Sequence, residues 1–335
     1  MDLKALGEKA GAAAPVIRPT PKLDDTLVVH VDGDMICYEC AGNDEVSQGE
    51  ARQRALNKIE QLRIRTGAHK AIVHITVPGC HKGYRNMIAT VKPYQDQRKS
   101  KGKPKNHGYI QDWLMSYKGP AFQTKTWNSR EADDGIAACA YYACANGGRI
   151  AIATADKDMR MLPGLHVDWK SGELVEVPYG AYDVVGAENG KQYGTKWFWL
   201  QMLQGDAADN IPGLPEYVTE NARGATVTKK LGEKTAEALL AKCKNNDAAF
   251  AEVYGLYCEY YEHIGFTYEE ADDRFCEQAA LLWMRTSAKA EVDNFMRHTG
   301  PGCISAGFPA ELKVAAGRLV QRVEKLIAEA KALGG

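Results

Sequence analysis

The chain has 335 residues, of which 45% are hydrophobic and 25% charged, a composition typical of a globular protein. These values exclude a mainly disordered chain, a collagen-like chain and a small disulfide scaffold. Lysine and arginine total 42 against 43 aspartate and glutamate, a net charge of −1 that lacks the basic excess common in nucleic-acid proteins. Because a sum says nothing about where charges lie, nucleic acid stays open as a partner.

Residues 1–26 predict a flexible N-terminal arm, stiffened by three prolines, and have no apolar core of the kind found in a signal peptide. An apolar run of about 18 residues, as a membrane helix requires, is absent from the sequence. The nine cysteines are scattered, and we interpret Cys37 and Cys40 as buried helical residues rather than half of a zinc site. A reducing, cytoplasmic location is the expectation.

Strands and helices alternate in the first part of the chain. Apolar, largely β-branched runs at 27–31, 71–77 and 149–154 predict strands, and the stretches 45–66 and 131–146 predict helices between them. This order indicates an α/β fold with a central, mainly parallel sheet flanked by helices. After about residue 195 the strand signals fade, and a helix is expected near 310–333. We therefore divide the chain into an α/β core at 27–195 and a helical region at 196–335.

Acidic residues follow the predicted strands at the places where ligands collect in such sheets. The carboxyl ends of parallel strands meet at one edge, so these acids are expected to converge there. Acids in the first turn of a helix also stabilise its positive end, and that simpler interpretation stays open for Glu131, Asp133 and Asp134. A converging cluster would need bound cations, and oxygen ligands alone favour Mg²⁺ or Mn²⁺, of which two together can hydrolyse a phosphodiester. The acids are Asp32 and Asp34, Asp156 and Asp158, and Glu131, Asp133 and Asp134.

A further acidic segment follows at 205–213. Asp206 and Asp209 are three residues apart, and we expect one helical turn to place both carboxylates on one face. A turn ending at Gly213 and a helix starting near Gly232, Lys234 and Thr235 would present backbone N–H groups to a DNA phosphate.

The segment 82–105 holds eight basic residues against one acidic residue, Asp96. Two tyrosines, Tyr84 and Tyr94, lie among the charges. A solvated loop is the simpler interpretation. A clamp on a phosphate backbone, with tyrosines stacking on bases, is favoured because the segment follows a strand whose end should face the acids. The basic residues include Arg85, Lys92, Arg98, Lys99 and Lys101.

These motifs in this order resemble the flap-endonuclease superfamily, notably bacteriophage 5′→3′ exonucleases and the 5′-nuclease domain of bacterial DNA polymerase I. The similarity covers about residues 27–245. It rests on Val31-Asp32-Gly33-Asp34, Tyr94-Gln95-Asp96-Gln97-Arg98, Arg130-Glu131-Ala132-Asp133-Asp134, Thr154-Ala155-Asp156-Lys157-Asp158, and Gly205 to Gly213 with Gly232 to Ala236.

The resemblance implies a PIN-like or FEN-like fold with a helix–three-turn–helix element at about 203–245. It implies a monomeric, two-metal 5′→3′ exonuclease with 5′-flap endonuclease activity on duplex or flapped DNA or RNA–DNA hybrid, acting in phage replication, primer removal or recombination. The helix–three-turn–helix element of the family can also bind K⁺. Arg85, Lys92 and Arg98 would guide the 5′ strand. The implied ligands of two Mg²⁺ or Mn²⁺ ions are Asp32, Glu131, Asp133, Asp134, Asp156, Asp158, Asp206 and Asp209.

Three departures from the family pattern matter. The second strand ends in Ile75-Thr76-Val77-Pro78-Gly79-Cys80 where the family usually has an aspartate, and Asp34 stands where it usually has a neutral polar residue. A longer connection at 216–231, with Arg223, Lys229 and Lys230, is either an extended DNA contact or a solvated loop. The missing aspartate leaves a structure-specific DNA-binding protein with weak catalysis as one alternative. A PIN-type ribonuclease is the other, although the long C-terminal part and the helix–turn–helix segment argue against it.

Overall fold

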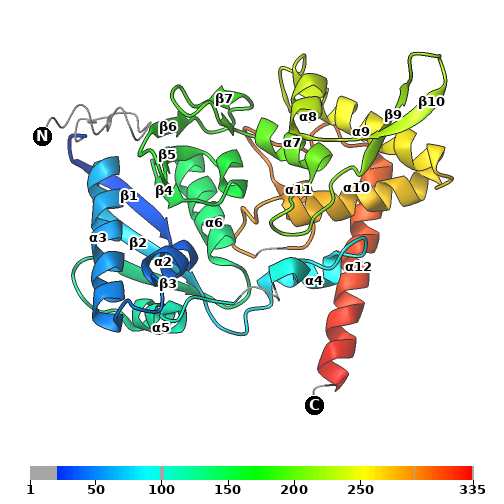
Figure 1. Ribbon diagram of the computed structural model, residues 1–335. Coiled ribbons are helices and arrows are strands. Elements are labelled where there is room, and N and C mark those ends of the chain that lie inside the picture. The colour runs from blue at the N-terminus through cyan, green and yellow to red at the C-terminus, as the bar shows by residue number, and fades with distance from the viewer. Residues whose placement is uncertain (1–20, 99–101, 290, 334–335) are drawn as a thin grey trace, which may run out of the picture.

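The computed structural model describes residues 21–98, 102–289 and 291–333 (Figure 1). Its main sheet has six strands in the order β3-β2-β1-β4-β5-β6. The first five are parallel to their neighbours and only β6 is antiparallel, which confirms the predicted mainly parallel sheet. The strands are β1 (Asp24–Asp32), β2 (Ala68–Thr76), β3 (Gln123–Trp127), β4 (Ala151–Thr154), β5 (Gly164–Asp168) and β6 (Leu174–Val177).

The central strands form because their β-branched residues are buried in a sheet that is covered on both faces. Val29 and Val31 of β1 are fully buried and pair in register with Ala71 and Val73 of β2. β1 begins at Asp24, so the last residues of the predicted arm 1–26 belong to the sheet. Residues 1–20 of that arm lie outside the described part of the chain.

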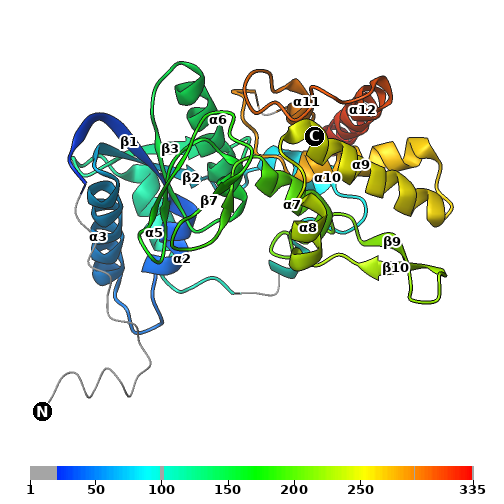
Figure 2. The same ribbon diagram turned by 90° about the horizontal axis from the view of Figure 1, so that it is seen from above.

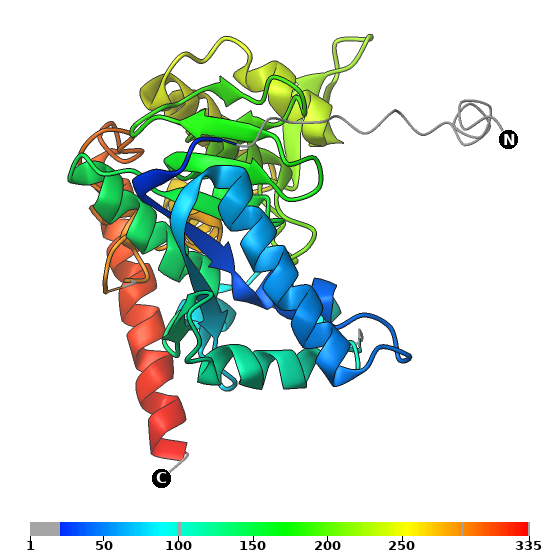
Figure 3. The same cartoon turned by 90° about the vertical axis from the view of Figure 1, so that its left-hand side faces the viewer.

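Helices cover both faces of the sheet, and the sheet lies between two apolar cores. α2 (Gly33–Cys40), α3 (Gln48–Thr66) and α5 (His107–Ser116) pack together on one face, and α6 (Ala132–Ala145) crosses the other (Figures 1 and 3). Cys37 and Cys40 are buried on α2, as predicted. Two short links join β2 to α5, namely η1–α4 (Lys82–Tyr84, Arg85–Ile88) and η2 (Asp96–Arg98).

The second part of the chain is mainly helical and shares an aromatic core with α6. Trp199, Tyr257 and Phe275 are fully buried there. The last helix, α12, extends away from the body in Figures 1 and 3. Within the described residues, none of the helices combines the length and apolar character needed to cross a membrane. The helices are α7 (Lys196–Gln204), α8 (Glu233–Leu240), α9 (Asn246–His263), α10 (Tyr268–Leu282), α11 (Asn294–Arg297) and α12 (Ala310–Leu333).

This part differs in two places from the prediction of a helical region with a helical turn at Asp206 and Asp209. The connection at 216–231 forms a hairpin of β9 (Glu216–Glu220) and β10 (Thr226–Lys230), which projects from the molecule in Figures 1 and 2. A smaller hairpin of β7 (Val184–Val185) and β8 (Gln192–Tyr193) precedes α7. Residues 205–211 form no helical turn: Asp206 and Ile211 exchange backbone hydrogen bonds across a tight loop, and Gly205 enters it with a φ of 70°.

Candidate metal centre

Three aspartates lie at the carboxyl ends of β1 and β4. Asp32 ends β1, accepts from the backbone N–H of Met35 at 3.2 Å, and receives the Thr154 hydroxyl at 2.8 Å. Asp156 and Asp158 follow β4, and the Asp158 N–H donates to Asp156 at 2.9 Å. Because β1 and β4 are parallel neighbours, the predicted convergence of these acids at one sheet edge is what the structure shows.

The loop after α7 brings two more carboxylates to the same place. Oxygens of Asp158, Asp206 and Asp209 lie within 4.8 Å of one another, a spacing that suits a shared cation. The Lys157 ammonium lies 2.7 Å from Asp206. Asp206 and Asp209 therefore lie with the other acids, as the resemblance implied, although a tight loop and not a helix presents them.

The three acids that open α6 divide between two roles. Glu131 and Asp133 belong to the acidic cluster, but both oxygens of Asp134 are taken by the Arg85 guanidinium, at 2.7 and 2.9 Å. Asp134 is fully buried and also accepts from the backbone N–H of Arg285 at 2.9 Å. The geometry therefore makes Asp134 and Arg85 a structural pair, whereas the sequence placed Asp134 with the metal ligands and Arg85 with the DNA contacts.

Asp34 lies beside the end of β2, the strand that lacks the acid expected there. From the first turn of α2 it reaches across to the end of β2, where it accepts from the Thr76 hydroxyl at 2.5 Å and the Thr76 N–H at 3.2 Å. The Thr76 hydroxyl oxygen in turn accepts from the Ala132 N–H at the start of α6, at 2.8 Å. A neutral residue on β2 and an acid on α2 thus exchange the places that the family pattern gives them.

Burial and mutual repulsion disturb the titration of this cluster. Burial, followed by the charge of Asp34, raises the pKa of Asp32 to about 7. Burial is also the main cause that raises the pKa of Asp156 to about 6, with Asp209 and Asp206 adding to it. The pKa of Asp133 is raised well above its ordinary value by burial and by Asp134 and Glu131. Such a cluster is costly unless cations neutralise it, and its all-oxygen donor set fits Mg²⁺ or Mn²⁺.

The predicted basic gateway does lie against the acids. The Tyr94 hydroxyl contacts Glu131 at 2.9 Å and Asp209 at 2.8 Å, and Lys82 lies 3.3 Å from Glu131. The Arg98 guanidinium is also paired with Asp209. The Tyr94 hydroxyl is therefore hydrogen-bonded to the acids, and its ring does not stand open for a base to stack on.

The remaining predicted nucleic-acid contacts differ in how accessible they are. Tyr84 stacks on His81, with ring centroids 4.0 Å apart. Lys92 is exposed, whereas Lys99 and Lys101 lie outside the described residues. Gly213 is buried and its N–H donates to Gln278, so it does not face a phosphate. The start of α8 is open: Gly232 and Lys234 are exposed there, and Thr235 is half-buried.

Gln201 is a residue of the site that sequence reasoning missed. It lies in the middle of the apolar helix α7, is fully buried, and donates to Asp158 at 2.5 Å. Its signal was present in the run Trp197-Phe198-Trp199-Leu200-Gln201-Met202-Leu203, because an amide inside so apolar a helix needs a polar partner.

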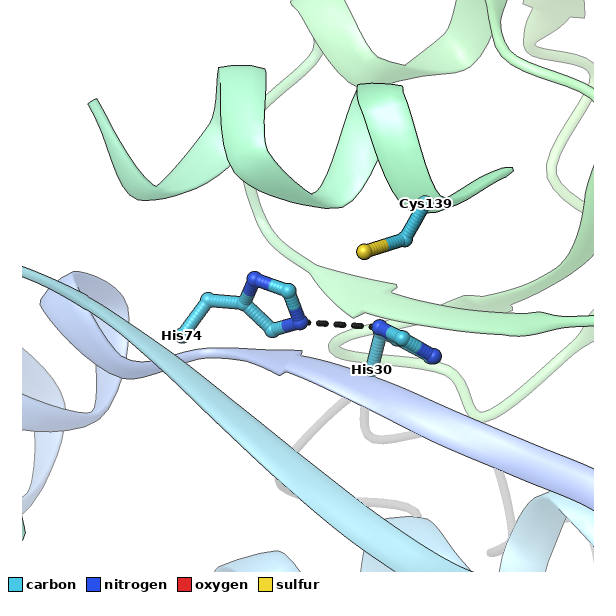
Figure 4. A group of neighbouring side chains, drawn as sticks. All are labelled: His30, His74 and Cys139. Atoms are coloured by element: carbon cyan, nitrogen blue, oxygen red, sulfur yellow. Dashed lines mark hydrogen bonds between the residues drawn. The ribbon is translucent and has the colours of Figure 1, made fainter. Parts of the chain in front are cut away.

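A second group of possible metal ligands lies where α6 packs on β1 and β2. His30 of β1, His74 of β2 and Cys139 of α6 point toward one another (Figure 4). Trp127 Nε1 can only donate, and it lies 3.0 Å from His74 Nδ1, so the proton of His74 is on Nε2, 2.8 Å from His30 Nδ1. The nitrogens that face each other share a hydrogen bond, and burial lowers the pKa of His30 to about 4. We interpret this group as a neutral hydrogen-bonded chain.

Comparison with known proteins finds similarity to a 5′-3′ exonuclease and to a DNA polymerase I. No protein-family model matches the chain. It is similar to a 5′-3′ exonuclease of Buchnera aphidicola subsp. Schizaphis graminum, with 26% identity over 226 residues, covering 65% of this chain and 71% of that protein. It is also similar to DNA polymerase I of Rhizobium leguminosarum, with 32% identity over 114 residues. That match covers 32% of this chain and only 10% of the polymerase.

Solved structures of the bacteriophage T5 flap endonuclease are similar over most of their length. A form crystallised with metal ions has 13% identity and a TM-score of 0.49, covering 88% of this chain and 99% of that one. A pseudo-enzyme-product complex of a variant of the same endonuclease, with DNA and metal ions, has 13% identity and a TM-score of 0.48, covering 89% and 99%.

Proposed function

We propose that the chain is a metal-dependent phosphodiesterase that cleaves DNA as a 5′→3′ exonuclease and 5′-flap endonuclease. The observation that carries this proposal is the convergence of buried and half-buried carboxylates from β1, α2, α6, the segment after β4 and the loop after α7 at one sheet edge. The name of one sequence relative, a 5′-3′ exonuclease, supports the exonuclease activity. Its natural task would be primer removal or the production of single strands during phage replication.

The proposed ligands of two Mg²⁺ or Mn²⁺ ions differ in two positions from the set that the sequence implied. Asp34 joins them because it stands at the end of β2 among the other acids, and Asp134 leaves them because Arg85 occupies both its oxygens. Bound divalent ions would activate a water and neutralise charge on the phosphate. The proposed set is Asp32, Asp34, Glu131, Asp133, Asp156, Asp158, Asp206 and Asp209.

The basic residues around the cluster would hold the substrate. Lys82 and Arg98 are partly exposed and pair with Glu131 and Asp209, so they can turn to a phosphate once cations neutralise these acids. The exposed start of α8 would hold the duplex backbone through its free N–H groups. Because Asp34 would supply a carboxylate beside the end of β2, the lack of an acid on β2 itself is no longer a reason to favour a binding protein without catalysis.

The test is cleavage of a 5′-labelled flap, a blunt DNA duplex and an RNA of equal length, each with Mg²⁺ or with EDTA. We expect short 5′ products from both DNA substrates in Mg²⁺ only. Binding of flap DNA without cleavage in Mg²⁺ or Mn²⁺ would indicate the binding protein, and cleavage of RNA alone would indicate the ribonuclease.

A further inference from the structure

A cavity of about 510 Å³ opens beside α6, away from the acidic cluster. It is bounded by the edge strand β3, the second half of α6 and the segments 286–288 and 294–299, all within the described residues. Its volume is within the range of sites that bind small organic molecules. The proposed nuclease activity does not use it.

The walls of this cavity combine cations with aromatic rings. Lys125, Arg130 and Arg297 line it, and none of its lining residues is acidic. Arg297 is paired with Asp293, whereas Lys125 is exposed and lies 4.7 Å from the centroid of the Trp127 ring. Lys125 therefore offers a positive charge at the rim.

Arg130 supplies the second charge from the floor. Only 3% of it is exposed, and its two terminal nitrogens donate to the backbone carbonyls of Ser287 and Ala288. Its Nε is buried without a hydrogen-bond partner, and Arg130 is among the residues that line the cavity. Its contacts among the described residues are these carbonyls and the Trp127 ring, 5.3 Å from the guanidinium carbon, so an anion in the cavity would stabilise its buried charge.

Aromatic side chains provide the other half of the site. Tyr142 is 75% exposed at the rim, and Tyr141 and Tyr179 form the wall with their rings edge to face. Thr286, Ser287 and Thr299 add hydroxyl groups, of which Thr286 donates to Asn294 and Ser287 to Glu291. A planar ring could stack on Tyr142 while its anionic group reaches Lys125 and Arg130.

We propose that this cavity binds a nucleotide, that is, a base carrying a phosphate, either as a free nucleoside monophosphate or as the end of a single strand. Lys125 and Arg130, whose hydrogen-bond partners are neutral, match a phosphate, the exposed tyrosine matches a base, and the hydroxyl groups match a sugar. Arg130 directly precedes Glu131, so one backbone segment contributes to both this cavity and the acidic cluster.

The test is calorimetric titration of the full chain carrying Asp133→Asn, in EDTA, with thymidine monophosphate and with a short oligothymidylate. These conditions remove metal-dependent binding at the acids, so the result does not depend on the nuclease proposal. We expect one ligand per chain, and Lys125→Ala or Tyr142→Ala to weaken binding about tenfold each. Lys118→Ala, which removes an exposed lysine outside the cavity, should leave it unchanged.

Tighter binding of the monophosphate would identify a free nucleotide as the ligand, and tighter binding of the oligonucleotide a strand end. The proposal is overturned if neither ligand binds, if Lys125→Ala and Tyr142→Ala bind as tightly as their parent, or if inorganic phosphate binds as well as the nucleotide.

Discussion

Replacing Asp133 or Asp156 by asparagine is expected to reduce cleavage by about 10²–10³-fold or more, while the metal-free protein becomes no less stable than the wild type. Both residues are half-buried carboxylates, and burial raises the pKa of each, so their charge is unfavourable in the folded protein without cations. Asparagine keeps the Oδ1 acceptor that each uses locally. Single-turnover cleavage in Mg²⁺ and thermal unfolding in EDTA measure the two effects.

Asp168 provides a matched control at the end of the neighbouring strand β5. Burial alone would raise its pKa, but hydrogen bonds from Lys191 and Ser171 lower it below its ordinary value. Asp168→Asn should therefore destabilise the protein and leave the cleavage rate of the folded enzyme unchanged. Full activity of Asp133→Asn, or equal loss of stability in all three variants, would show that the acidic cluster is not the site.

The Arg85–Asp134 pair should dominate the stability of the junction between α6 and the helical region. Arg85→Ala is expected to lower the free energy of unfolding by about 3–5 kcal/mol, because it leaves the Asp134 carboxylate fully buried without its cation. Denaturant unfolding at neutral pH measures the loss. The effect should appear without Mg²⁺ as well, because Asp134 is not among the proposed ion ligands.

Two further variants separate pairing from general loss of an arginine. Arg85→Met with Asp134→Leu removes both charges and should recover much of the lost stability. Arg54→Ala breaks an exposed pair with Glu50 and should cost less than about 1 kcal/mol. If Arg85→Ala is as mild as Arg54→Ala, the pair does not hold the junction together.

The sequence predicted the sheet and the acidic edge because both follow local rules. Runs such as Leu27 to Val31 carry the strand signal themselves, and an acid directly after a strand must lie at the sheet's carboxyl edge. The hairpin β9–β10 was not predicted because its strand formers, Tyr217 to Thr219 and Thr226 to Thr228, are two short runs next to Glu and Lys, and its strands are held by their pairing rather than by burial.

Roles that depend on distant partners could not be predicted. Arg85 and Asp134 are 49 residues apart, and a charge count treats the arginine as part of a basic surface. The spacing of Asp206 and Asp209 suits a helical turn as well as a tight loop, and the backbone pairing of Asp206 with Ile211 decides between them. The exchange of Asp34 and Thr76 appears only when α2 and β2 are seen side by side.

The central claim is that the acids at this edge bind two divalent ions. Counting bound Mn²⁺ by electron paramagnetic resonance tests it without any substrate. Protons and cations compete for the same oxygens, and the pKa values of Asp32 and Asp156, about 7 and about 6, mean that both carry protons in mild acid. Binding should therefore strengthen as the pH rises through this window and level off above it.

At about pH 8 we expect two Mn²⁺ ions per chain in the wild type and a reduced number or affinity in Asp156→Asn. At about pH 5.5 the wild-type affinity should fall by about tenfold or more. Less than one ion per chain at the higher pH, or binding that neither pH nor Asp156→Asn changes, would contradict the assignment of this edge as the metal centre.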